Sequence, residues 1–189
     1  MFTRSTTRIA AGLWLCGLLV LPAQASAQDL ERFEGIIVYT GPGTGLSQFS
    51  IRVQEYTTDA EARTFLDLLT NEGWEKLEAA FLQGEKARFQ IPGQLSHNVA
   101  FARSFKTETG RIVRFATARR ISMGAFWNST RSRDYAFALI ELRLDENDEG
   151  SGIVLSAAKL GVDENGELDI ESYGHPPFSI TTVHVDDGT

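Results

Sequence analysis

The sequence predicts an α+β, β-rich fold: an antiparallel meander of about nine strands forming a barrel-like or strongly curved sheet, with a short helix pair inserted between strands two and three. Three observations predict it. Residues 134–144 alternate as one long strand, shorter alternating segments recur between tight turns, and the hydrophobic period becomes helical only between residues 58 and 84. Regularly spaced strands joined by tight turns favour a sheet closed, or nearly closed, on itself.

The long strand, DYAFALIELRL, has one face that is apolar throughout. Its other face is apolar as far as Leu139 and charged at Glu141 and Arg143. Because alternate side chains of a strand point to opposite faces, its first half must be covered on both sides. We expect the helix pair to provide the second cover. The other strands are expected at residues 35–40, 47–55, 86–91, 98–105, 112–118, 153–160, 167–173 and 178–185.

The helix pair begins with a capping box, Thr58 and Glu61, in which each side chain satisfies a free backbone N–H of the first turn. The pattern breaks at residues 71–73 and stops at Gly84, which gives two helices of about ten residues each. Their packing stripes are expected to be Ala62, Phe65, Leu66 and Leu69 in the first helix, and Trp74, Leu77 and Phe81 in the second.

The first 27 residues have the pattern of a cleaved signal peptide. Arg4 and Arg8 precede an apolar run at residues 9–21 that is too short to span a membrane, and residues 25–27 form a small-residue cleavage site. We therefore expect an exported protein, periplasmic or secreted, with one domain at residues 28–189 and a frayed acidic C-terminus.

The only cysteine, Cys16, lies inside this expected signal, so the mature chain has no thiol chemistry and no disulfide. Trp14 and Leu15 precede it, where a lipid-anchor signal would have small residues, so we expect no stable membrane anchor. Without Arg4 and Arg8 the chain retains 16 basic residues against 25 acidic ones, which argues against nucleic acid as a partner.

The charge is uneven along the chain. Eight basic residues lie between Arg103 and Arg133, whereas twelve acidic residues lie between Glu141 and Asp187. The two segments either neutralise each other across neighbouring strands or leave an anion-binding patch.

The candidate ligand-binding site is an aromatic and guanidinium cluster around residues 123–133. Aromatic faces and guanidinium groups together hold planar or anionic ligands by stacking and forked hydrogen bonds. The alternative is a loop whose aromatic side chains cap the barrel while its arginines pair with acidic turns. The small residues Ala136 and Ala138 leave room for a ligand unless Trp74 or Phe81 fills the space. The candidate residues are Arg119, Arg120, Phe126, Trp127, Arg131 and Arg133.

Catalytic and metal motifs are weak. Asp145, Asn147 and Glu149 begin like a calcium loop, but its twelfth position is Ser156, so this is not an EF-hand. A solvated hairpin turn is expected, and the alternative is a looser calcium site formed by this acidic turn. The histidines His97, His175 and His184 have no metal-ligand spacing, and the chain has no GxSxG motif. We expect no metal, no cofactor and no identifiable catalytic residue.

Three blocks resemble a family of uncharacterised exported bacterial proteins: AFALIELRLD, GSGIVLSAAKLGVDENG and IESYGHPPFSITTV. The hairpin near the N-terminus, the helix pair and RIVRFATARRI fit the same pattern, so the resemblance covers most of the mature chain. It implies export and α+β character but no activity.

Three hypotheses follow. The first is a non-enzymatic ligand-binding or accessory module of the cell envelope, whose ligand is small and anionic or planar, or whose partner is an envelope protein. The second is an envelope hydrolase, which requires a histidine to meet acids in one cleft. The third is a structural or partner-binding protein that uses an exposed apolar sheet edge.

Overall fold

A computed structural model describes residues 30–39, 44–119, 121, 135–164, 168–172 and 177–186. The expected signal peptide at residues 1–27 and the last three residues of the expected frayed tail lie outside this part of the chain, so both remain predictions.

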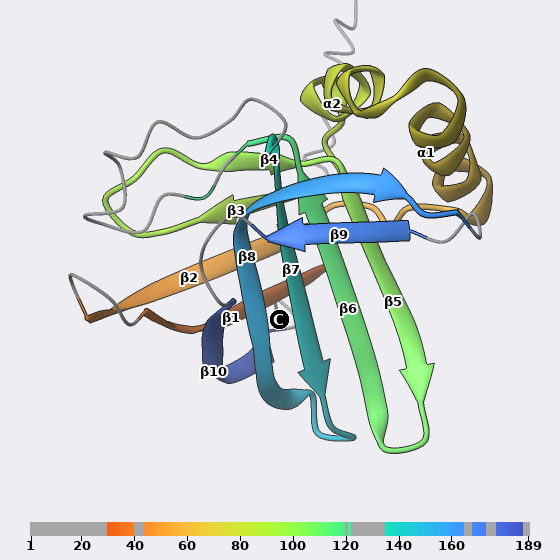
Figure 1. Cartoon of the computed structure of the whole chain (residues 1–189). Helices are drawn as coiled ribbons and strands as arrows, with labels where there is room; N and C mark the ends of the chain where they lie inside the picture. Colours follow the sequence, from red (N-terminus) through yellow and green to blue (C-terminus); the bar gives the residue numbers. More distant parts are fainter. Residues whose placement is uncertain are drawn as a thin grey trace, which may run out of the picture.

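Ten strands form one antiparallel sheet, in agreement with the predicted fold class (Figure 1). The order in the sheet is β4-β3-β2-β1-β10-β8-β7-β6-β5, and β9 pairs with β8 outside this path. The strands are β1 (Glu31–Tyr39), β2 (Gly45–Val53), β3 (Ala87–Gln90), β4 (His97–Val99), β5 (Phe101–Thr107), β6 (Gly110–Thr117), β7 (Phe137–Leu144), β8 (Glu149–Val162), β9 (Leu168–Ser172) and β10 (Phe178–Asp186).

The sheet is nearly closed because its two ends, β4 and β5, follow each other in the chain with only Ala100 between them. The Ala100 N–H donates to the Ala116 carbonyl (3.1 Å), which ties this junction to β6. The sequence predicted one strand here at residues 98–105. Its first part pairs with β3 and its second part with β6, so it turns the corner of the barrel.

The helices α1 (Asp59–Glu72) and α2 (Trp74–Gln83) lie between β2 and β3, and α1 is longer than the predicted ten residues. The predicted capping box is present: Thr58 accepts from the Glu61 N–H (3.3 Å), and Glu61 accepts from the Thr58 N–H (2.8 Å). Glu61 also accepts from Lys86 (2.7 Å), which fixes the start of α1 to the residue before β3. Leu66 of the predicted packing stripe is 43% exposed, because Phe65 and Leu69 supply the contacts to the sheet.

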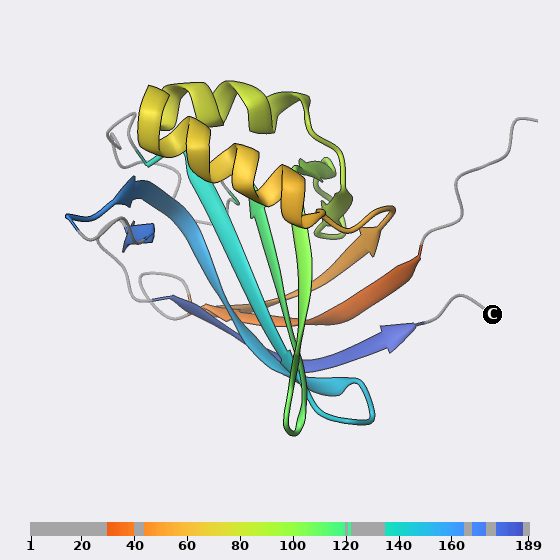
Figure 2. The ribbon, with the colours of Figure 1, turned by 90° about the vertical axis from the view of Figure 1, so that its right-hand side faces the viewer.

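Two apolar cores share β7. Ala138, Ile140 and Leu142 point into the barrel, while Phe137 and Leu139 belong to a second cluster under the helices. Both faces of the first half of β7 are therefore buried, as predicted. Figure 2 shows the helix pair on one side of the sheet, with β1, β2 and β10 on the other.

Ala136 and Ala138 lie in different cores, although the alternation predicted one face. Ala136 packs in the cluster that contains Leu77 and Phe81, and Ala138 is buried in the barrel. The strand begins at Phe137, so Ala136 precedes the regular alternation. Both alanines serve close packing.

An ion pair crosses one end of the barrel. The Arg111 guanidinium on β6 donates to both Glu31 carboxylate oxygens on β1 (2.9 and 3.0 Å) and to Asp148 in the β7–β8 turn (2.8 Å). The Tyr56 hydroxyl donates to the same Glu31 (2.8 Å), and the Arg111 guanidinium lies 5.6 Å from the centroid of the Phe33 ring. Since β1 and β6 are not neighbours in the sheet, this network joins opposite walls of the barrel.

Replacing Arg111 by Met should lower the free energy of unfolding by about 2–3 kcal/mol, because it leaves the half-buried Glu31 carboxylate without its cation. Urea denaturation at pH 7 measures this loss. The matched control is Arg143→Met, which removes a guanidinium that is 71% exposed and should change stability by less than about 0.5 kcal/mol. Equal effects of the two substitutions would contradict a bridging role for Arg111.

Stability should fall as the pH drops from 4.5 towards 2. Hydrogen bonds from Lys86 and Thr58 lower the pKa of Glu61 from 4.5 to about 2. A lowered folded-state pKa stabilises the fold above the unfolded-state value and loses that contribution as pH falls through the folded-state value. Glu61→Gln keeps the capping geometry but removes the charge, so its thermal midpoint should depend less on pH in this window. Glu108→Gln in the exposed β5–β6 turn is the control, and an equal pH dependence for both variants would contradict the assignment.

Candidate ligand-binding groove

A groove of about 530 Å³ lies on the outer faces of β1, β2, β3 and β10, a volume in the usual range for small-ligand sites. Alternation places Arg32, Glu34 and Ile36 of β1 on this outer face, because Phe33 and Ile37 point into the barrel core. The same alternation places Gln48, Ser50 and Arg52 of β2 there, while the inward-facing Phe49 reaches the groove from the core. We call it the outer groove. It is lined by Arg32, Glu34, Gly35, Ile36, Gln48, Phe49, Ser50, Arg52, Gln90, Pro92, Thr182 and His184.

Three arginines stand in one row across the sheet. Arg32 of β1 lies directly opposite Arg52 of β2, and Arg52 lies directly opposite Arg88 of β3. Like charges in directly opposed positions destabilise a sheet unless each has a counter-charge. Arg32 pairs with Glu34, and Arg88 pairs with Glu85.

Arg52, in the middle of this row, makes no ion pair or side-chain hydrogen bond with any other described residue. Its side chain is exposed and lines the outer groove. A guanidinium between two others attracts anions, and its planar fork fits carboxylate and phosphate groups. Arg52 is therefore the group in the groove best placed to hold an anion.

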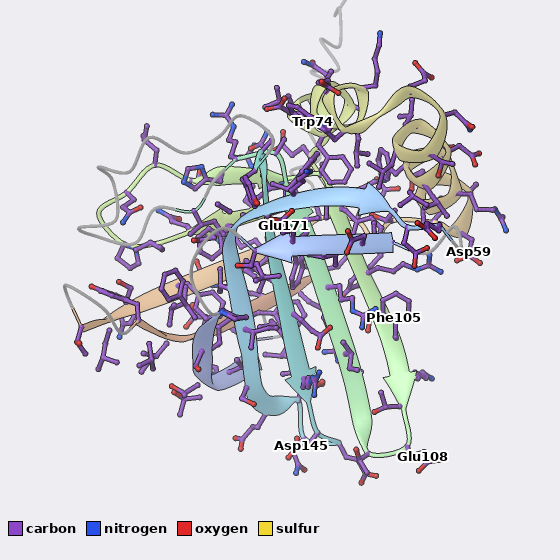
Figure 3. All side chains as sticks on the ribbon, in the orientation of Figure 1. Asp59, Trp74, Phe105, Glu108, Asp145 and Glu171 are labelled. Atoms are coloured by element: carbon purple, nitrogen blue, oxygen red, sulfur yellow. The ribbon has the colours of Figure 1, made fainter. Side chains whose placement is uncertain are left out.

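A contrasting arginine pair lies on β5 and β6. Arg103 and Arg114 are also directly opposite each other, and their guanidinium groups lie 5.2 and 5.4 Å from the centroid of the Phe105 ring. Arg103 pairs with Asp59 at the start of α1, and Figure 3 marks Asp59 and Phe105. Arg114 pairs with Glu141 (2.8 Å).

The expected neutralisation between the basic and acidic segments is thus present in two places. Arg114 on β6 pairs with Glu141 on β7, and Arg111 pairs with Asp148 (2.8 Å) in the turn that follows. These cations are held by internal partners, in contrast to Arg52.

A histidine and a carboxylate meet beside the arginine row. His184 Nε2 on β10 lies 3.6 Å from Glu34 Oε2 on β1, and both residues line the outer groove. Glu34 thus lies between His184 and Arg32. The Arg32 Nε atom is buried and has no hydrogen-bond partner among the described residues. On this side of the groove, the Glu34 carboxylate is therefore already paired with Arg32 and lies beside His184.

A strained bulge forms the wall of the groove on β10. The register shifts between Ile180 and Val183 on β10, where Thr182 and Val183 together face the single residue Gly35 of β1, so β10 contains one extra residue here. Thr182 has a φ of +51°, which is rare for a β-branched residue. Strained backbone of this kind occurs most often at binding and catalytic sites.

The sequence-predicted cluster is only partly described. Arg119 is exposed, and its N–H donates to the Thr117 hydroxyl oxygen (3.1 Å). Burial lowers the pKa of His97, and the positive charge of Arg119 lowers it further, so Arg119 lies within electrostatic range of that ring. The outer groove does not include Arg119. The other predicted site residues, Arg120, Phe126, Trp127, Arg131 and Arg133, lie outside the described residues, and their role remains a prediction.

The acidic turn after β7 has a structural role. The Asp145 carboxylate accepts the N–H groups of Asn147 (2.8 Å) and Glu149 (3.1 Å), and these hydrogen bonds lower the pKa of Asp145. Among the described residues, no three histidine, cysteine or acidic side chains gather as metal ligands. Nor does any helix in the described part of the chain have the length and apolar character needed to cross a membrane.

Comparisons with known proteins return nothing: no family model, curated protein or solved structure matches this chain.

Replacing Thr182 by Gly should raise the free energy of unfolding by about 0.5–1 kcal/mol. The substitution removes the strain of a β-branched residue in the left-handed region, and this gain exceeds the entropic cost of glycine. Thermal unfolding measures the effect. The neighbouring Thr181, whose φ is not positive, is the control: Thr181→Gly should destabilise by a similar amount. Destabilisation by both substitutions would contradict strain at Thr182.

Proposed function

We propose that this protein is a non-enzymatic ligand-binding module that is exported to the bacterial cell envelope, and that the outer groove is its binding site. Export rests on the charged start, the apolar run and the small-residue cleavage pattern of residues 1–27. Binding rests chiefly on Arg52, a cation that has no ion-pair partner in the described part of the chain and stands in the middle of an arginine row that borders a groove. The ligand carries at least one anionic group that Arg52 binds.

The groove favours binding over hydrolysis. Cross-strand register places Ser50, Glu34 and His184 in one row, with the carboxylate between the hydroxyl and the imidazole. Nucleophilic catalysis needs the imidazole between the other two groups, so that it can take the proton of the nucleophile. The meeting of His184 with Glu34 is the one observation that favours the hydrolase alternative, and this order of groups argues against it.

A second candidate function is partner binding through β9. This strand pairs only with β8 among the described residues, and its Leu168 and Ile170 are 52% and 43% exposed. An exposed apolar edge strand can add a strand of another chain. Replacing Leu168 and Ile170 by Lys would abolish binding of such a partner and leave the outer groove unchanged. This double variant therefore separates the two functions.

Replacing Arg52 by Gln should weaken anion binding about tenfold or more, the equivalent of one lost charge-assisted hydrogen bond. Citrate is the probe, and backbone amide shifts in ¹H–¹⁵N NMR spectra report binding. Shifts should gather on the groove-lining residues of β1, β2 and β10. Arg88→Gln is the matched control, because Arg88 stands in the same row, pairs with Glu85 and does not line the groove. Equal weakening by both substitutions, or no shifts in the groove, would contradict the proposal.

A further inference from the structure

The uncharged side chains of the outer groove bear on the class of its ligand. Gln48, Ser50, Gln90 and Thr182 all line it. The side chains of these four residues make no hydrogen bond with other described residues. Each offers both a donor and an acceptor, and an alcohol group needs both. The groove therefore has unused hydrogen-bonding capacity that suits hydroxyl groups.

Register places these groups within reach of one ligand. Gln48 lies opposite Ile36, and Ser50 lies between Glu34 on one side and Gln90 on the other. Arg52 is two residues further along β2, on the same outward face. A ligand that lies along β2 can thus place an anionic group on Arg52 and hydroxyl groups on Ser50 and Gln48, with Gln90 beside them on β3.

The exposed apolar lining of the groove is aliphatic. Phe49 contributes to the wall of the groove but is only 3% exposed, so its ring face is not available for stacking. The remaining apolar contacts come from Ile36 and Pro92, which are small, non-planar surfaces. Such aliphatic surfaces can contact the C–H groups of a saturated ring.

We propose that the outer groove binds a carboxylated saccharide, with its carboxylate on Arg52 and its hydroxyl groups on Gln48, Ser50, Gln90 and Thr182. This inference rests on the proposed binding function and specifies its ligand. Thr182 contacts the ligand directly in this assignment, and the bulge in β10 sets the position of its side chain. A free uronic acid and an acidic polysaccharide chain both carry this combination of a carboxylate and hydroxyl groups.

Isothermal titration calorimetry of the full protein tests this with three probes: galacturonic acid, its linear trimer, and a neutral galactose trimer. The trimer of galacturonate should bind at least tenfold more tightly than the neutral trimer. Tighter binding of the acidic trimer than of the monomer identifies a chain as the ligand, whereas equal affinity identifies a free sugar acid. Equal binding of the acidic and neutral trimers would overturn the assignment.

Two variants and a control separate hydroxyl recognition from simple charge attraction. Gln48→Ala should weaken the galacturonate trimer about fivefold or more, because it removes an amide that binds a hydroxyl group and removes no charge. Arg88→Gln, which changes a charge outside the groove, should leave trimer binding unchanged. Thr182→Gly should weaken the trimer while raising the thermal midpoint, an outcome that loss of folding does not give. If citrate binds in the groove and the acidic trimer does not, the saccharide assignment is wrong and the binding function stands. If neither binds, both are wrong.

Discussion

The ion pair between Arg111 and Glu31 is the constraint on which the rest of the structure depends. A sheet that curls into a barrel must hold its opposite walls together where side chains no longer fill the interior. Here one guanidinium on β6 binds both oxygens of a carboxylate on β1 and a second carboxylate in the β7–β8 turn. Burial and the hydrogen bond to Glu31 raise the pKa of Tyr56, so its hydroxyl stays protonated and keeps donating to the network.

This cross-barrel network fixes the orientation of β1, and β1 carries the floor of the outer groove. Glu31 and Phe33 point into the network and the core, so the alternate residues Arg32 and Glu34 point outward. The same alternation continues through β2 and gives Arg52 its exposed position. Six of the described arginines are thus held by carboxylates within the fold. Arg52, like Arg63 and Arg119, makes no ion pair with another described residue, but of these three only Arg52 lines the outer groove.

Part of this organisation follows from the sequence alone. The capping box at Thr58 and the two apolar faces at the start of β7 depend on local spacing, which a sequence displays directly. The arginine row cannot be predicted from the sequence in this way. Arg32, Arg52 and Arg88 are far apart in the chain and become neighbours only through strand register. Register depends on turns and bulges that periodicity does not encode.

Three other features lay beyond sequence reasoning for separate physical reasons. The break at Ala100 comes from barrel closure, in which one strand changes partners, and the alternation at residues 98–105 is the same either way. The strain at Thr182 comes from a bulge that adds one residue to β10, the strand between β1 and β8. A threonine in an alternating segment predicts ordinary extended backbone instead. The His184–Glu34 contact likewise requires β10 to pair with β1, which joins the two ends of the described chain.

The most direct test of the difference between the paired arginines and Arg52 is solvent exchange of the Nε–H groups, measured by ¹H–¹⁵N NMR spectroscopy. Arg52→Lys and Arg111→Lys variants assign the two signals. The account predicts a slowly exchanging Arg111 Nε–H, which donates to Asp148, and a rapidly exchanging Arg52 Nε–H in the ligand-free protein. Slow exchange at Arg52 without a ligand would show that an internal partner already holds it, and would contradict the account.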